Sequence, residues 1–274
     1  SSDLLVYGFN RAATHGWGNS TTLSLFAISA LFLVGFVVIE RMVANPLLPL
    51  RVVTERNRGG SYLGSMVVGA GLFAMFLFLG LYLQVILGYS PLRSGFAFLP
   101  FTAGIIIFAG IASQLMPKIG PKPLMIPGLV IAASGMFLLM RLTPTSSYVS
   151  HVLPSLLIIS SGMALCFIPL STTSLHNVGT HDAGVASAMM NTSQQIGGSL
   201  GTALLNTVAA TATSNYIAAH AQMGKTVQVY GMVHGFTVAF QVGAIFLLVG
   251  ALILLTFVNV GKDAVVENEG VVLH

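Results

Sequence analysis

The polar side chains best suited to binding a ligand lie inside a long apolar stretch, residues 185–212. Asn191 and Gln195 are four residues apart and share one face of a helix, with Gln194 beside them. Gly197 and Gly201 follow with the same spacing, which is typical of a helix face that packs closely against another helix. Amides in an apolar environment are costly unless they are hydrogen-bonded or hydrated. The pattern therefore predicts either amides that line a ligand cavity or amides that only hydrogen-bond between helices.

The other candidate groups do not form the patterns expected of an enzyme or a metal site. His176 and His181 are five residues apart, with Asp182 beside them, whereas paired His ligands on a helix prefer a spacing of four. Cys166 is the only cysteine, so it is best interpreted as a small buried side chain. The apolar stretches contain neither a central acid nor a nucleophile–base pair. We expect no enzymatic activity, no catalytic residue, no bound metal and no cofactor.

The composition indicates the class of molecule that must position these side chains. Charged residues make up 7% of the 274 residues and hydrophobic residues 55%. A soluble domain carries about 25% charged residues, and a disordered chain is much less apolar. The net charge of +4 forms no basic stripe, so we expect no nucleic-acid partner. The sequence predicts a polytopic membrane protein whose partner is the lipid bilayer.

Apolar stretches long enough to cross a bilayer recur along the chain. Crossing takes about 20 helical residues, and runs such as residues 105–109 do not alternate as the strands of a membrane barrel would. The expected spans are residues 21–40, 61–87, 95–115, 123–142, 151–172, 185–212 and 233–259. Residues 41–60 and 213–232 are expected to be polar connections. Residues 4–9 are apolar but too short to cross, and are interpreted as the end of a truncated span.

The distribution of Lys and Arg predicts the orientation, because cytoplasmic loops carry an excess of both. One side of the predicted topology collects Arg41, Arg51, Arg56, Arg58, Lys118, Lys122 and Lys262. The other side collects Arg11, Arg93, Arg141 and Lys225. The first set, and with it the C-terminus, is therefore expected in the cytoplasm. A Gly-x-Ala sequence at residues 95–97 returns at residues 184–186 on the opposite side, as an inverted repeat of three spans would require.

Four runs of residues give the chain a resemblance to a known family, and it extends over nearly the whole sequence. The runs are NPLLPLR at 45–51, LYLQ at 81–84 with GYSP at 88–91, GFAFLP at 95–100, and NTSQQIGG at 191–198. In order and spacing they resemble the drug:proton antiporters with 14 spans in the major facilitator superfamily. The resemblance implies an all-α, major-facilitator-type six-helix half bundle with one preceding span, in the plasma membrane as a multi-pass protein.

The resemblance also implies a domain layout. Residues 1–60 would hold the end of one extra span, an outer loop, a second extra span and a cytoplasmic linker. Residues 61–259 would form the C-terminal six-span half, a 3+3 inverted repeat, and residues 260–274 a cytoplasmic tail. The N-terminal half of the same protein would be a missing partner. It would carry the proton-coupling acids, which agrees with the charge-free spans found here.

The implied activity is proton-coupled export of lipophilic or cationic drugs by alternating access, with protons and a small lipophilic substrate as partners. Expected cavity residues are Gln84, Phe98, Asn191, Gln194 and Gln195, with Gly197 and Gly201 in helix packing. The superfamily's cytoplasmic gating loop would fall on residues 113–122. Gly120 and Lys122 match its pattern and Lys118 replaces an Arg, but Pro117 replaces its Asp, so a gating salt bridge is in doubt. The alternatives are a non-transporting membrane subunit and an exporter of an endogenous lipid or metabolite.

Overall fold

The computed structural model describes residues 7, 19–43, 50–179 and 182–260, and within these ranges it is helical and contains no strand. Residues 4–9 apart from Tyr7, residues 45–49, His181 and the tail beyond Val260 lie outside the described residues. The helices are α2 (Ser20–Met42), α3 (Leu50–Thr54), α4 (Arg56–Leu81), α5 (Pro91–Ala97), α6 (Leu99–Ile119), α7 (Lys122–Leu139), α8 (Leu153–Ser174), α9 (Ala183–Ala219) and α10 (Val227–Phe257). A π-helical turn, η1 (Tyr82–Ile86), extends α4. A second π-helical turn, η2 (Tyr148–Val152), leads into α8, and the short 3-10 helix η3 (Ala221–Thr226) joins α9 to α10.

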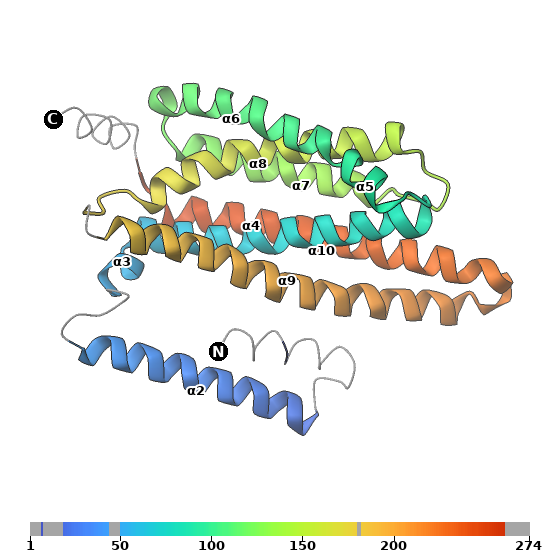
Figure 1. Cartoon of the computed structure of the whole chain (residues 1–274), viewed down its shortest axis with the longest axis horizontal. Helices are drawn as coiled ribbons and strands as arrows, with labels where there is room; N and C mark the ends of the chain where they lie inside the picture. Colours follow the sequence, from blue (N-terminus) through green and yellow to red (C-terminus); the bar gives the residue numbers. More distant parts are fainter. Residues whose placement is uncertain (1–6, 8–18, 44–49, 180–181, 261–274) are drawn as a thin grey trace.

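Local sequence signals set several helix ends. Ser90 caps α5 by accepting a hydrogen bond from the backbone N–H of Arg93, and Pro91 fits the first turn because it needs no N–H partner there. Gly120 ends α6 with φ +85°, in the left-handed region that glycine adopts without a Cβ penalty. These ends produce short turns, so α4 and α6, and likewise α6 and α7, run in opposite directions (Figure 1).

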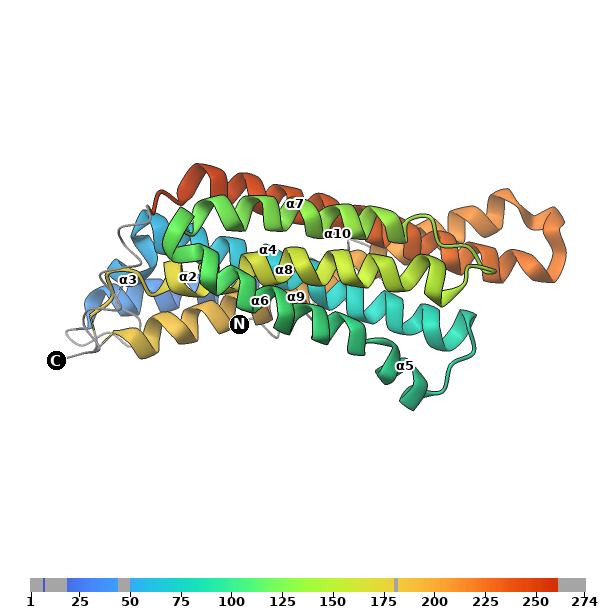
Figure 2. The ribbon, with the colours of Figure 1, turned by 90° about the horizontal axis from the view of Figure 1, so that it is seen from above.

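Helices α4 to α10 form one bundle, and α2 lies at its margin on the side of α9 (Figure 1). Helix α8 packs against both α6 and α7, α10 packs against α7, α4 and α9, and α4 packs along α9. The centre is apolar, with the large side chains of Met75, Phe78, Tyr82 and Phe240 almost fully buried. The hairpin of α9 and α10 extends past the ends of the neighbouring helices (Figure 2).

The expected spans correspond to the observed helices, with one informative difference. Among the described residues, six helical segments are long and apolar enough to cross a membrane, and α9 is not one of them. Its sequence is interrupted by Asn, Gln, Ser, Thr and Gly, although it packs within the bundle. At 37 residues α9 is about 55 Å long, against a hydrocarbon core of about 30 Å.

The expectation of a long polar connection over residues 213–232 was wrong. Helix α9 continues to Ala219 and α10 begins at Val227, so only a short turn separates them. Polarity suggested a loop, but the two helices stay packed against each other along this extension: a Cβ on Gly231 would meet the Ile217 side chain. Tertiary contact therefore keeps polar sequence helical beyond the apolar stretch.

Candidate functional site

One face of α9 carries a continuous stripe of polar side chains. Asn191, Gln195 and Asn206 are exposed, and Ser199 and Thr202 between them are half-buried. Their spacing of three and four residues places them on one face of the helix. Within the described part of the chain, the three amide side chains have no hydrogen-bond partner. We call these five residues the α9 polar stripe; hydrocarbon would leave their amides unsatisfied, so the stripe requires water or a polar partner.

The opposite side of α9 is built for close packing on α4. A Cβ on Gly197 would overlap the backbone of Met66, and one on Gly201 would overlap Ala70. Small residues allow such contacts between membrane helices, where van der Waals packing replaces the hydrophobic effect. The glycines predicted for helix packing therefore lie in the α4–α9 contact, and this contact turns the polar stripe outward.

A row of phenylalanines lies beside the stripe. The ring of Phe73 in α4 covers the position where Gly198 of α9 would carry a Cβ. Phe76, one turn further along α4, has its ring centroid 5.1 Å from Phe98 and 5.2 Å from Phe101. Phe73 and Phe76 are 47% and 40% exposed, so a ligand can reach their rings. The surface thus combines aromatic faces with amides and hydroxyls.

The structure brings only some of the predicted cavity residues together. Asn191 and Gln195 belong to the stripe, and Phe98 joins the aromatic row through Phe76. Gln194 is half-buried and its backbone lies against Gly69 of α4.

Gln84 is exposed in the turn that ends α4. It lies about 27 Å along the helix axis from Met66, where Gly197 packs. Gln84 and the first amides of α9 are therefore at different depths.

The predicted gating loop is a tight turn between α6 and α7. The backbone N–H of Gly120 donates to the carbonyl oxygen of Met116 at 2.8 Å. Lys118 is exposed and Lys122 is half-buried, and neither forms an ion pair with any residue that the structure describes. The loop offers positive charge at this end of the bundle without a salt bridge of its own.

A separate crevice of about 270 Å³ lies between α4, α9 and α10. Its lining is apolar, from residues such as Leu200, Leu204 and Phe246, and none of the stripe residues contributes to it. Val249 at its edge is exposed in the same part of α10 as Leu248 and Leu252, an apolar surface suited to lipid. The crevice and the polar stripe are therefore distinct surfaces.

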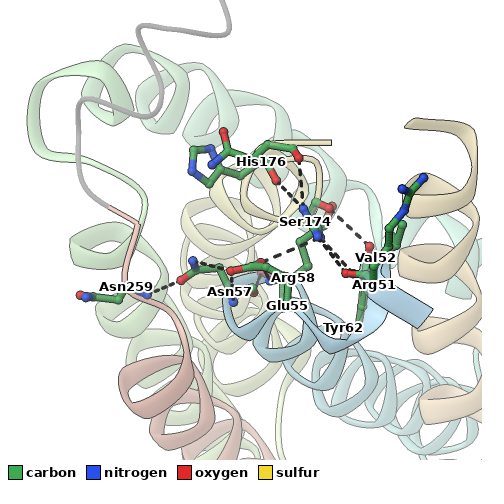
Figure 3. A network of polar contacts seen from close by, with 11 residues as sticks. Arg51, Val52, Glu55, Asn57, Arg58, Tyr62, Ser174, His176 and Asn259 are labelled. Carbon is green, nitrogen blue, oxygen red and sulfur yellow. Dashed lines mark hydrogen bonds and ion pairs between the residues drawn. The ribbon is translucent and has the colours of Figure 1, made fainter. Parts of the chain in front are cut away.

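The basic end of the bundle holds a polar network centred on Arg58 (Figure 3). The buried guanidinium donates to four backbone carbonyl oxygens: Val52 at 2.9 Å, Arg51 at 3.0 Å, His176 at 3.1 Å and Asn177 at 3.3 Å. The first two belong to α3 and the last two to the turn after α8. A guanidinium suits this role because its five donors form a rigid fork. Arg58 therefore joins α3, α4 and the end of α8.

Neighbouring residues complete the network. Glu55 caps α4 by accepting hydrogen bonds from the backbone N–H groups of Asn57 and Arg58. Burial raises the pKa of Glu55, but these hydrogen bonds and the charge of Arg58 outweigh it and hold the pKa below its ordinary value. The Asn57 side chain accepts from the backbone N–H of Asn259, which ties α4 to the end of α10 (Figure 3).

The sequence contained a signal for the part of the α9 polar stripe that was not predicted. The spacing from Asn191 and Gln195 continues through Ser199, Thr202 and Asn206, so the full stripe could have been found by periodicity. The Arg58 network had no such signal, because its acceptors are backbone carbonyls, and two of the four lie more than a hundred residues away in the chain.

A bundle of apolar spans with one polar, close-packed helix is the architecture of a helical membrane transporter. Residues 25–202 match the family model described as Major Facilitator Superfamily. The chain belongs to the Major Facilitator Superfamily, as a transporter-type protein rather than an enzyme. The predicted family and the major-facilitator-type helical bundle are thereby confirmed, and the chain is a multi-pass protein of the plasma membrane.

Curated relatives of the chain are named for drug resistance and export. The puromycin resistance protein pur8 of Streptomyces alboniger is 44% identical over 89% of this chain and 49% of its own length. The cephamycin export protein CmcT of Amycolatopsis lactamdurans is 35% identical over 77% of the chain and 44% of its own length. The tetracenomycin C resistance and export protein of Streptomyces glaucescens is 28% identical over 75% of the chain and 38% of its own length. The chain thus spans about half the length of these relatives or less.

Proposed function

We propose that this chain forms the C-terminal half of a proton-coupled exporter of lipophilic or cationic compounds. The single observation that carries the proposal is the α9 polar stripe, a row of exposed amides and half-buried hydroxyls on a helix of an otherwise apolar membrane bundle. Facing a central aqueous pathway, the stripe would be hydrated instead of buried in lipid. The names of the relatives support export of drug-like molecules.

In this proposal the stripe and the row of phenylalanines form one wall of a substrate cavity. Amides and hydroxyls would hydrogen-bond polar groups of the substrate, while Phe73, Phe76 and Phe98 would stack on its flat apolar part. The opposite wall would come from an N-terminal half, which would also supply the proton-carrying acids. The two halves would rock around this cavity in alternating access.

We further propose that the end carrying the Arg58 network is cytoplasmic, and the C-terminus with it. The residues at this end are Arg51 in α3, Arg56 and Arg58 at the start of α4, Lys118 in the last turn of α6 and Lys122 at the start of α7. The opposite end carries Arg93, Arg141 and Lys225. This asymmetry is what the positive-inside rule describes.

The test is export of puromycin by the full protein in cells. We choose this probe because the relative that is 44% identical is named for puromycin resistance. Expression should lower the steady-state puromycin content of the cells, and a protonophore should restore it. Export that survives the protonophore would contradict proton coupling, and no change in puromycin content on expression would contradict a role in its export.

A matched pair of glutamine variants tests the stripe itself. Gln195→Ala should reduce export at unchanged protein level. Gln241→Ala should not, because Gln241 is an exposed amide on α10 in a row with the exposed apolar residues Ile245, Leu248 and Leu252. Equal export by parent and Gln195→Ala would remove Gln195 from the proposed cavity wall.

A further inference from the structure

Helices α5 and α6 belong to one membrane segment, which is broken at Phe98 (Figure 2). Pro100 lies in the first turn of α6 and has no N–H to offer the carbonyl oxygen four residues earlier. The backbone N–H of Phe101 would bond to Ala97 in a continuous helix, but it donates to the carbonyl oxygen of Phe98 at 3.1 Å. The break therefore leaves the carbonyl oxygen of Ala97 without its usual helical partner.

The hydroxyl of Tyr148 takes the place of that partner. Tyr148 lies in η2, 51 residues later in the chain, and its O–H donates to the carbonyl oxygen of Ala97 at 2.6 Å. An unpaired carbonyl oxygen is costly in apolar surroundings. The bond satisfies this oxygen and joins the segment that leads into α8 to the break between α5 and α6.

A second tyrosine and an arginine support the ring of Tyr148. Tyr89, in the turn before α5, has its ring centroid 6.4 Å from that of Tyr148. The Arg93 guanidinium of α5 lies over the Tyr89 ring, 3.9 Å from its centroid, as in a cation–π contact. Both tyrosines are half-buried, but the hydroxyl of Tyr89 forms no hydrogen bond with any residue that the structure describes. The two tyrosines therefore differ in one hydrogen bond.

The bond from Tyr148 holds the backbone that carries the Phe98 ring. The Ala97 carbonyl and the Phe98 N–H belong to one planar peptide unit. Its oxygen is held by Tyr148, and its N–H donates to the carbonyl oxygen of Gly95 at 3.1 Å. The next peptide unit is held as well, because the carbonyl oxygen of Phe98 accepts hydrogen bonds from two N–H groups of α6. The Cα of Phe98 thus lies between two fixed planes, which set the direction of its side chain.

We infer that Tyr148 is a positioning residue, whose hydroxyl acts through the Ala97 carbonyl to hold the ring of Phe98 against Phe76. The centroids of these two rings are 5.1 Å apart in the row of phenylalanines. Without the hydroxyl, the peptide unit can rotate and the Phe98 ring leaves this place for part of the time. The inference rests on the proposed export function, because it gives the Phe98 ring a part in binding substrate.

The first test is export of puromycin by the full protein, normalised to protein level. Tyr148→Phe removes the hydroxyl and keeps the ring. It should raise KM for puromycin about fivefold, the factor that corresponds to the net worth of one hydrogen bond. The maximal rate should stay unchanged, because the ring contributes to binding. Tyr89→Phe, which removes a hydroxyl that bonds to no described residue, should leave KM unchanged. An unchanged KM in Tyr148→Phe, or an equal rise in both variants, would overturn the inference.

A double-mutant cycle separates positioning from a general structural role. A hydroxyl with a general structural role would affect KM whether or not the Phe98 ring is present. In a Phe98→Ala background, Tyr148→Phe should raise KM no further, because two changes that act through the same ring are not additive. A further rise of about fivefold in this background would overturn the inference.

The second test does not depend on transport. 4-Fluorophenylalanine at position 98 of the full protein in detergent gives a 19F resonance that reports the surroundings of this ring. The resonance should broaden or split in Tyr148→Phe and stay as in the parent in Tyr89→Phe. The same probe in place of Phe96 is the control, because that ring is 61% exposed and precedes the held peptide unit. Its resonance should be the same in all three proteins.

The outcomes separate this inference from the proposed function. An unchanged resonance at position 98 in Tyr148→Phe, or equal changes at positions 96 and 98, would overturn the positioning role whatever the export result. If the full protein fails to export puromycin but only the resonance at position 98 changes, the positioning of Phe98 stands and the proposed function fails.

Discussion

Gly197 of α9 lies against the backbone of Met66 in α4 so closely that a Cβ on Gly197 would overlap the Met66 carbonyl oxygen. One turn further along, Gly201 lies against Ala70 in the same way. The two helices therefore meet backbone to backbone. This contact fixes which face of α9 is covered, and so leaves Asn191 and Gln195 exposed.

Enlarging Gly197 should weaken the folded state. Gly197→Ala would force α4 and α9 apart, at a cost of about 1–3 kcal/mol typical of overpacking. The measurement is the thermal unfolding temperature of the full protein in detergent, which should fall. Gly184→Ala is the matched control: a Cβ there meets nothing within 4 Å, and alanine favours the helix. Equal unfolding temperatures for Gly197→Ala and the parent would show that the contact is not close-packed.

Lysine should not replace Arg58. A single ammonium cannot reach four carbonyl oxygens spread over α3 and the turn after α8, so buried acceptors lose their donors. We expect Arg58→Lys to lower the free energy of unfolding by about 2–3 kcal/mol, as for the loss of buried charge-assisted hydrogen bonds. Chemical unfolding in detergent measures this. Arg56→Lys serves as the comparison, because Arg56 is exposed and contacts one carbonyl, Thr256. Similar losses in the two variants would contradict the special role of the buried arginine.

Phe76 should contribute to recognition of flat aromatic compounds. Its ring is 40% exposed and contacts both Phe98 and Phe101, so it is held in place while one face stays accessible. Phe76→Ala should raise KM for puromycin about fivefold, the factor expected for the loss of one aromatic contact. Initial export rates over a range of puromycin concentrations give KM. Phe96→Ala, which removes a 61% exposed ring, should leave KM unchanged, and an equal rise in both variants would exclude a specific role for Phe76.

Stability should depend on pH through Glu55. The folded protein holds the pKa of Glu55 below its ordinary value of 4.5, so the carboxylate stabilises the folded state above pH 4.5. This contribution is lost as the pH falls through the lower, folded-state pKa. The difference in unfolding free energy between parent and Glu55→Gln should therefore shrink on acidification, measured by chemical unfolding at a series of pH values. The difference in unfolding free energy between parent and Gly184→Ala should not change with pH. A difference between parent and Glu55→Gln that is independent of pH would refute a lowered pKa of Glu55 in the folded protein.

The sequence alone determined the class of this protein and the positions of most helices. Low charge and long apolar runs leave membrane-spanning helices as the solution, because only helices satisfy all backbone groups within a single segment. Periodicity also predicted that the amides Asn191 and Gln195 share one helix face and the glycines Gly197 and Gly201 another. Helical spacing separates these two faces before any partner is known.

Tertiary structure decided which faces meet and which distant groups combine. Gln84 and Gln195 are alike in type and exposure, but only the packing of α4 on α9 shows that they lie at different depths. Arg58 finds its acceptors in carbonyl groups that every residue possesses, so no pattern of side chains predicts them. The extension of α9 to Ala219 depends likewise on contact with α10, because packing keeps a polar segment helical where its composition indicates a loop.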